Sequence, residues 1–318
     1  MAMTVPDPSK TTFVFPGQGS QKLGMGKDLA AAYPEAKDIF DEADRLLGFS
    51  LSKICWEGPE AELNDTVNTQ PALLVHSIAA LRVFEKLQPT FQPAHVAGHS
   101  LGEISAAVAA SALDFPAALK LVRRRGELMK LAGQQNPGGM AAILGLDIET
   151  LDKICFKASI VGKEVVQVAN DNCPGQVVIS GHSGAVNRAI ELAREAGAKR
   201  ALPLAVSIAA HSPLMAGAQD QFRIAVDEAL IEDPHIPIVG NVGADLLKTA
   251  EMIRGDLYGQ LTSRVHWTES IRNLRKLGIT AFIELGTGSV LTGLLKRIDA
   301  EAEGIALGEP SDFEKFVS

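Results

Sequence analysis

The 318-residue chain lacks the features that mark membrane, exported and disulfide-bonded proteins. It has no run of 18 uninterrupted apolar residues, so we expect no membrane span. Its first ten residues contain no apolar segment of the kind that signal peptides carry. The three cysteines, Cys55, Cys155 and Cys173, form no C-x-x-C pair and cannot all be paired with one another. A reducing compartment is the simplest setting for them, and we expect a cytoplasmic protein.

The composition excludes other classes of protein. The net charge of −8 argues against nucleic acid as a partner. The glycine-rich loop at residues 16–21 is not followed by G-K-[ST] and lacks the Rossmann spacing, which argues against a nucleotide site. With 46% apolar and 21% charged residues, the chain is typical of soluble globular proteins. Its length is enough for one large core, or for one large and one small core.

The stretch around Ser100 reads as a nucleophile elbow. An apolar run ends at Gly98, and an alanine-rich helical run from Ile104 to Leu113 begins almost at once. Ser100 therefore stands where a strand turns sharply into a helix, in the pattern G-x-S-x-G, with its hydroxyl exposed at the sheet edge. The backbone N–H of Leu101 falls at the helix N-terminus, where it could stabilise a developing oxyanion. A similar stretch, residues 181–184 (G-H-S-G), lacks a second glycine at the right spacing, and we interpret it as a turn.

Two further residues are candidates for the same site. Gln18 follows the expected strand Thr11 to Phe15, so its amide could donate to the oxyanion if that strand neighbours the one before Ser100. A serine hydroxyl needs a base, and seven histidines are available. His211 is favoured because it lies where an inserted segment rejoins the main body, whereas the side chain of His99 should point away from its neighbour Ser100. No acid stands out as a third member, and a backbone carbonyl could orient the imidazole equally well.

The pattern of elements predicts two units. Strands alternate with helices through most of the chain, which is typical of a parallel-sheet α/β body with helices on both faces. Residues 134–203 instead read as strand, helix, strand, strand, helix, strand, the order of a ferredoxin-like α+β unit. We therefore predict a body made of residues 1–133 and 204–318, with 134–203 inserted. We also expect Pro71 to open a helix that ends near Leu87, and a strand over Ile236 to Val242.

Several motifs together resemble the malonyl-CoA:acyl-carrier-protein transacylases, from about residue 12 to 308. These motifs occur in the family's order, at matching spacing, at residues 15–21 (F-P-G-Q-G-S-Q), 69–72 (T-Q-P-A), 98–103 (G-H-S-L-G-E), 125–126 (R-G), 172–181 (N-C-P-G-Q-V-V-I-S-G), 210–212 (A-H-S) and 284–291 (E-L-G-T-G-S-V-L).

The resemblance implies a fold and roles for individual residues. The fold would be an α/β-hydrolase-like body with a ferredoxin-like insert. Ser100 would be the acylated nucleophile and His211 its base, and Gln18 and the Leu101 N–H would form the oxyanion hole. Arg125 would bind the free carboxylate of the malonyl group, because a planar guanidinium matches a carboxylate in a bidentate way. The position before Trp267, often glutamine in the family, is His266 here, and it is a possible site for orienting the catalytic histidine.

The resemblance also implies the reaction. We expect a ping-pong transfer of malonyl from malonyl-CoA to acyl carrier protein, for fatty acid synthesis. We expect no cofactor, no metal, no nucleic acid or membrane partner, and a monomer. A trans-acting acyltransferase of polyketide synthesis would use the same residues, a serine esterase would use the elbow but not Arg125, and a non-enzymatic binding module would need none of them.

Overall fold

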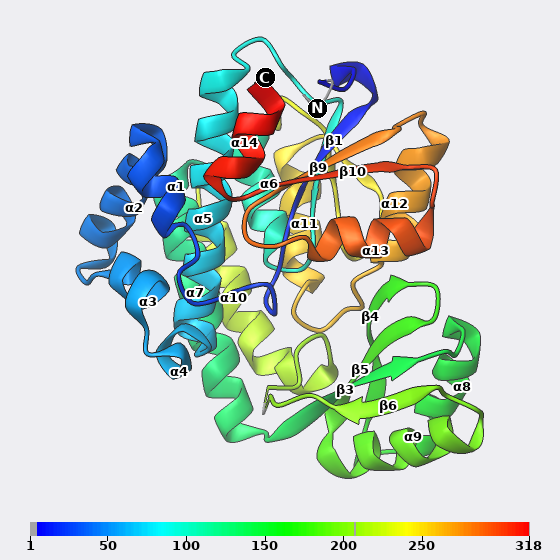
Figure 1. Ribbon diagram of the computed structural model, residues 1–318. Coiled ribbons are helices and arrows are strands. Elements are labelled where there is room, and N and C mark those ends of the chain that lie inside the picture. The colour runs from blue at the N-terminus through cyan, green and yellow to red at the C-terminus, as the bar shows by residue number, and fades with distance from the viewer. Residues whose placement is uncertain (1–4, 207, 318) are drawn as a thin grey trace.

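The protein contains two β-sheets, a larger one in the body and a smaller one below it in the view of Figure 1. The computed structural model describes residues 5–206 and 208–317, so residues 1–4, 207 and 318 of the predicted body lie outside the described part. The body sheet has the order β10-β9-β1-β2-β7-β8 and is parallel except for the antiparallel pair β7 and β8. Its strands are β1 (Thr11–Phe15), β2 (His95–Gly98), β7 (Ile238–Val239), β8 (Leu246–Leu247), β9 (Ala281–Leu285) and β10 (Glu303–Leu307).

Helices cover both faces of the body sheet. On β1, Phe13 and Phe15 face one apolar cluster, which includes much of α5, and Val14 faces another, which includes Trp267 of α12. The helices of the body are α1 (Lys27–Ala32), α2 (Pro34–Leu47), α3 (Leu51–Glu57), α4 (Glu60–Leu63), α5 (Thr66–Leu87), α6 (Gly102–Ala109), α7 (Phe115–Gln135), α10 (Ala216–Glu228), α11 (Ala250–Gly259), α12 (Trp267–Lys276), α13 (Val290–Ile298) and α14 (Pro310–Val317), with short 3-10 helices η1 (Pro8–Lys10) and η2 (Pro213–Met215). None of the helices in the described residues has the length and apolar content that crossing a bilayer requires.

The smaller sheet has the order β4-β5-β3-β6 and is antiparallel throughout. It has its own apolar cluster, to which its two helices contribute. Its elements are β3 (Gly138–Leu144), α8 (Ile148–Ala158), β4 (Val166–Cys173), β5 (Gln176–His182), α9 (Ser183–Glu195) and β6 (Arg200–Pro203). This is the predicted ferredoxin-like order, and the predicted fold class is confirmed. The domain boundaries at residues 133/134 and 203/204 stay a prediction.

Strand β4 also joins the smaller sheet to the body. The Asp171 N–H donates to the Val265 carbonyl over 3.0 Å, and the Val265 N–H donates to the Ala169 carbonyl over 2.8 Å. Val265 lies in the connection between α11 and α12 of the body. The two sheets are therefore tied together by backbone hydrogen bonds at this point.

Two predicted boundaries are wrong. Pro71 lies inside α5, which begins at Thr66 with the Asp65 side chain as its N-cap. Pro71 has no N–H for the Val67 carbonyl, and Arg123 Nη1 donates to that carbonyl instead, over 3.1 Å.

The predicted strand over residues 236–242 is reduced to Ile238–Val239. Beyond it, the N–H groups of Asn241 and Val242 donate to the Asp256 carboxylate rather than to a neighbouring strand. The chain therefore leaves the sheet just where it reaches the carboxyl edge of β2.

Candidate active site

Ser100 stands in a sharp turn between β2 and α6, with a φ of 52°, in the left-handed region. Glycine is required on both sides of it. A Cβ on Gly98 would lie 1.9 Å from the carbonyl of Gly102, and a Cβ on Gly102 would lie 2.1 Å from the carbonyl of Phe15 on β1. Because no side chain can fit in these gaps, strand and helix approach closely enough to hold the serine in a strained backbone conformation.

Ser100 Oγ lies 2.8 Å from His211 Nε2. The other imidazole nitrogen, Nδ1, lies 2.8 Å from the Gln260 carbonyl and 3.1 Å from the Ser263 carbonyl. Carbonyls only accept, so Nδ1 carries the proton and Nε2 is free to take the serine proton. The partner of the imidazole is therefore a pair of backbone carbonyls rather than an acid.

The imidazole is held neutral. Burial, and then the positive charge of Arg125 and the neighbouring His99, lower the pKa of His211 to about 3, although the two carbonyls act in the opposite direction. A base must be unprotonated to accept a proton, and this environment keeps His211 in that form throughout the neutral pH range.

Arg125 of α7 is almost wholly buried, with 1% of its surface exposed. Its three nitrogens donate to Gln260 Oε1 over 3.0 Å, to Gln70 Oε1 over 2.9 Å and to Ser100 Oγ over 3.1 Å. Burial lowers the pKa of Arg125 to about 10, against the opposing effect of Glu103, so the guanidinium stays charged at neutral pH. A fixed positive charge thus lies directly beside the serine hydroxyl.

A chain of side-chain hydrogen bonds leads from Arg125 to Gln18. Gln70, which accepts from Arg125, donates through Nε2 to Thr66 Oγ1 over 2.9 Å, and Thr66 Oγ1 donates to Gln18 Oε1 over 2.9 Å. The amide oxygen of Gln18 is thereby occupied, which leaves its NH2 group to donate elsewhere. Strands β1 and β2 are neighbours, so Gln18 and Ser100 both follow strands at the same sheet edge.

The Leu101 N–H donates to no other group among the described residues, and it lies at the N-terminus of α6. The Ser100 N–H donates to Asn241 Oδ1 over 2.7 Å, and Asn241 Nδ2 donates to the Gly98 carbonyl over 2.8 Å. Asn241 therefore holds the backbone of the elbow on both sides of His99, at Gly98 and at Ser100.

Gln260 is a site residue that the sequence reasoning missed. Its backbone carbonyl accepts from His211, its Oε1 accepts from Arg125, and its Nε2 donates to the Ser100 carbonyl over 3.0 Å and to Glu103 Oε2 over 2.9 Å. It stands just after α11 in no recognisable motif, so no local signal points to it.

Two of the other histidines are separate from this cluster. His99 Nε2 donates to Asn172 Oδ1 over 2.8 Å, and the His99 ring packs edge-on against Trp267. His266 was expected as a possible orienting position, and here the structure corrects the expectation. Its ring lies 3.7 Å from the Glu269 carboxylate and its carbonyl accepts from Ser270, whereas the carbonyls that meet His211 belong to residues six and three positions earlier.

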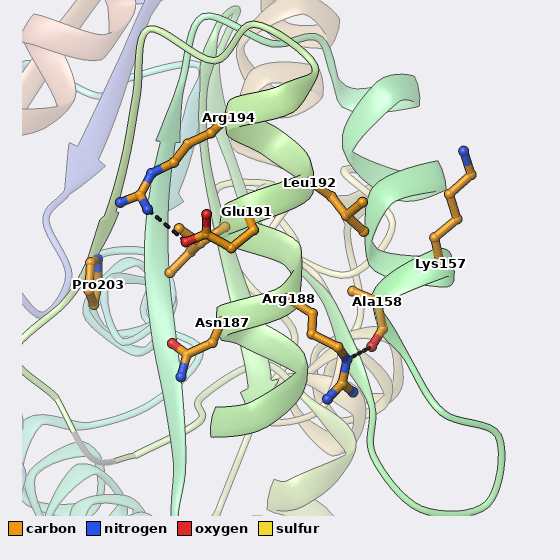
Figure 2. Close-up of a pocket in the computed structure, with 9 residues that line it drawn as sticks. Lys157, Ala158, Asn187, Arg188, Glu191, Leu192, Arg194 and Pro203 are labelled. Carbon is orange, nitrogen blue, oxygen red and sulfur yellow. Dashed lines mark hydrogen bonds and ion pairs between the residues drawn. The ribbon is translucent and has the colours of Figure 1, made fainter.

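The described residues hold no candidate metal site, and a cavity in the smaller sheet is lined by none of the residues above. The described residues contain no group of three or more histidine, cysteine or acidic side chains arranged to hold a metal ion. A cavity of about 560 Å³ lies at α8 and α9 of the smaller sheet, and Figure 2 draws the residues that line it. Its arginines are already partnered: Arg188 donates to the Ala158 carbonyl and Arg194 pairs with Glu191.

A serine beside a neutral imidazole on an α/β fold is typical of enzymes that transfer acyl groups through a covalent intermediate. Comparisons with known proteins agree with this class. The family described as acyl transferase domain matches residues 12–307, and the chain belongs to this family.

Among curated proteins, the malonyl CoA-acyl carrier protein transacylase of Bacillus subtilis is 48% identical over 306 residues, with 96% of each chain covered. The protein of that name from Escherichia coli is 45% identical over 299 residues, with 94% of this chain and 96% of the other covered.

Solved structures give the same result. An acyl carrier protein S-malonyltransferase from Vibrio cholerae superimposes with a TM-score of 0.92 at 45% identity, covering 96% of this chain and 99% of the other. A malonyl-transacylase in complex with the acyl carrier protein of a type II PKS gives a TM-score of 0.93 at 42% identity, covering 97% and 99%.

Proposed function

We propose that this protein transfers the malonyl group from malonyl-CoA to the phosphopantetheine thiol of an acyl carrier protein. The observation that carries the proposal is the position of Ser100 Oγ, 2.8 Å from His211 Nε2 and 3.1 Å from Arg125 Nη2. A nucleophile thus has a neutral base on one side and a buried cation on the other. The names of the relatives supply the acyl donor and acceptor.

In the first half-reaction, His211 Nε2 takes the Ser100 proton as the oxygen attacks the thioester carbonyl. The carbonyl oxygen becomes an oxyanion, which the Leu101 N–H and the Gln18 amide stabilise. As the tetrahedral intermediate collapses, the C–S bond breaks, and CoA leaves as a thiol with the proton from His211. The product is a malonyl ester on Ser100.

In the second half-reaction, His211 takes a proton from the phosphopantetheine thiol, and the sulfur attacks the ester. The same donors hold the second oxyanion. The C–O bond to Ser100 then breaks, and His211 returns the proton to the serine. The enzyme ends in its starting state, so neither a metal nor an organic cofactor is needed for the balance of atoms and charge.

Arg125 selects the acyl group in this proposal. Its pKa keeps it charged, and its donation to Ser100 Oγ over 3.1 Å supports a contact with the far carboxylate of a three-carbon diacid bound to that serine. A simple serine esterase would have no use for a buried guanidinium there, and a non-enzymatic binding module would have no use for the elbow strain.

Intact-mass measurement after incubation with acyl-CoAs tests the proposal. Malonyl-CoA should add one malonyl group to the wild-type protein and none to Ser100→Ala, and acetyl-CoA should add far less. The added group should be lost when an acyl carrier protein bearing phosphopantetheine is supplied. A wild-type protein that gains no malonyl group, or that is acylated equally by acetyl-CoA, contradicts the proposal.

A role in polyketide synthesis is the second candidate, because one similar structure is a complex with the carrier protein of a type II PKS. Fatty acid and polyketide carriers present the same thiol on different surfaces. Transfer rates to one carrier of each kind decide between them: a preference for the polyketide carrier favours the second role.

We further propose that residues 134–203 form a ferredoxin-like subdomain and that the protein works as a cytoplasmic monomer. The separate apolar cluster of the smaller sheet supports the first point. Three buried cysteines with free thiols support a reducing location.

A further inference from the structure

One side chain from the smaller sheet reaches the catalytic loops of the body. Gln167 lies on β4, and its Nε2 donates to the His211 carbonyl over 2.8 Å and to the Thr262 carbonyl over 2.9 Å. Both neighbours are carbonyl oxygens, which only accept, so the amide nitrogen rather than the amide oxygen faces them. Gln167 therefore bridges the backbone of the imidazole-bearing residue to the loop at residues 260–263.

That loop is the one that holds the imidazole. The carbonyls of Gln260 and Ser263 accept from His211 Nδ1, while the carbonyl of Thr262, between them, accepts from Gln167. The loop thus accepts hydrogen bonds from the ring of His211, and Gln167 donates hydrogen bonds to both the loop and the backbone of His211. These contacts close a ring of hydrogen bonds around the histidine.

The backbone of His211 needs such support. Its φ is 56°, in the left-handed region that a residue with a Cβ rarely adopts. Conformations of this kind persist only where the surroundings hold them. Two and four residues further along β4, at Ala169 and Asp171, the strand is fixed to the body by the two hydrogen bonds with Val265. Gln167 therefore projects from an anchored strand rather than from a mobile one.

We propose that Gln167 is a positioning residue: its bridge between the His211 and Thr262 carbonyls sets the imidazole at the distance and angle that Ser100 requires. The inference rests on the proposed role of His211 as the base. It gives the smaller sheet a part in the chemistry, because β4 supplies a group that acts on the reacting pair through the backbone. Gln167 itself does not touch Ser100 or the substrate in this proposal.

Two substitutions test the bridge. Gln167→Glu keeps the shape but replaces the NH2 group, which makes both donations, with a carboxylate oxygen that faces two carbonyls, and Gln167→Met keeps the length but removes all hydrogen bonding. Each should lower kcat for malonyl transfer about 10- to 100-fold, because a small displacement of a catalytic group costs about two orders of magnitude. The KM for malonyl-CoA should stay within about twofold, because the contacts of Arg125 are untouched. The matched control is Gln221→Glu, on an exposed part of α10.

A second readout is independent of the acyl donor. The rate at which phenylmethylsulfonyl fluoride inactivates Ser100 depends on the serine–histidine pair but not on recognition of malonyl, and it should fall by a similar factor in both variants. If the wild-type protein reacts with this reagent but never accepts malonyl, the proposed function fails while the role of Gln167 is still tested.

The proposal is overturned if both variants keep the wild-type kcat and inactivation rate, whatever happens to their melting temperature. A rise in KM at unchanged kcat overturns it as well, because that result assigns Gln167 to substrate binding. If both variants fail to fold, Gln167 has a purely structural role, and the proposal is overturned.

Discussion

Replacing Arg125 with methionine is the sharpest test of how this site chooses its acyl group. Methionine approximates the length of the stem and removes the charge, so the cavity left behind is smaller than in an alanine variant. A guanidinium has five N–H donors, and three are used by Gln260, Gln70 and Ser100. One N–H on each of Nη1 and Nη2 is thus left for the carboxylate of malonyl.

The size of the effect follows from the burial of the charge. Truncating one partner of a buried, hydrogen-bonded charge pair costs about 2–5 kcal/mol. At 1.36 kcal/mol for each factor of ten, kcat/KM for malonyl-CoA should fall about 30- to 5,000-fold. The acyl group of acetyl-CoA has no free carboxylate, so acetyl-CoA loses none of the interaction energy with Arg125. The preference for malonyl over acetyl should therefore fall by the same factor as the malonyl rate.

The assay is the rate of acylation of Ser100 by each acyl-CoA, measured by rapid quench and intact mass. The ratio of the two rates cancels any loss of folded protein, which matters because Arg125→Met also leaves Gln70 and Gln260 with unpaired oxygens. Arg124→Met is the matched control, since its side chain is about half exposed and pairs with Glu127. Equal losses with malonyl-CoA and acetyl-CoA would refute the reasoning and leave Arg125 a structural role only.

Three further outcomes follow from the same geometry. Because the pKa of His211 is lowered to about 3, kcat/KM should stay flat between pH 7 and pH 5. A histidine with the ordinary pKa of about 6.5 would keep only about 3% of its base form at pH 5. A pH profile of kcat/KM with a midpoint at about 6.5 would contradict this expectation. Thr66→Val should lower the acylation rate roughly fivefold to tenfold, because the Gln18 amide loses the hydrogen bond that fixes its orientation, and an unchanged burst in rapid-quench experiments would count against the relay. Gly102→Ala should lower the melting temperature and abolish acylation, since the new Cβ would lie 2.1 Å from the Phe15 carbonyl, and a variant with wild-type values for both would disprove the steric argument.

The parts of the site that could be predicted from the sequence are those set by local backbone geometry. Gly98 and Gly102 indicate a close approach of strand and helix, and both lie within the five residues of the G-x-S-x-G pattern. Gln18 could be predicted because it follows a strand directly, and parallel strands bring their carboxyl ends to one edge. Both inferences needed only the order of elements.

The remaining contacts left no local pattern. Gln167 and Gln260 act through side-chain hydrogen bonds to residues at least 44 positions away, and a glutamine in such a role looks the same in sequence as one on the surface. The expectation at His266 failed for this reason: the carbonyls that orient the imidazole are defined by the path of a loop, and any residue type can supply a carbonyl. The expectation at Pro71 was wrong for a different reason. Proline is favoured in the first turn of a helix, but here it lies inside α5, where Arg123 donates to the Val67 carbonyl that Pro71 leaves without an N–H partner.

The electrostatics of the site explain how one cation can serve two tasks. Burial and the neighbouring Asp256 raise the pKa of Glu103 well above its usual value, and burial also raises the pKa of Asp256. Each of these two carboxyl groups therefore keeps a proton more readily than an exposed carboxyl group would. The positive charge of Arg125 adds to the effect of burial in keeping His211 unprotonated, and in the proposed function the same charge would attract the carboxylate of an incoming malonyl group.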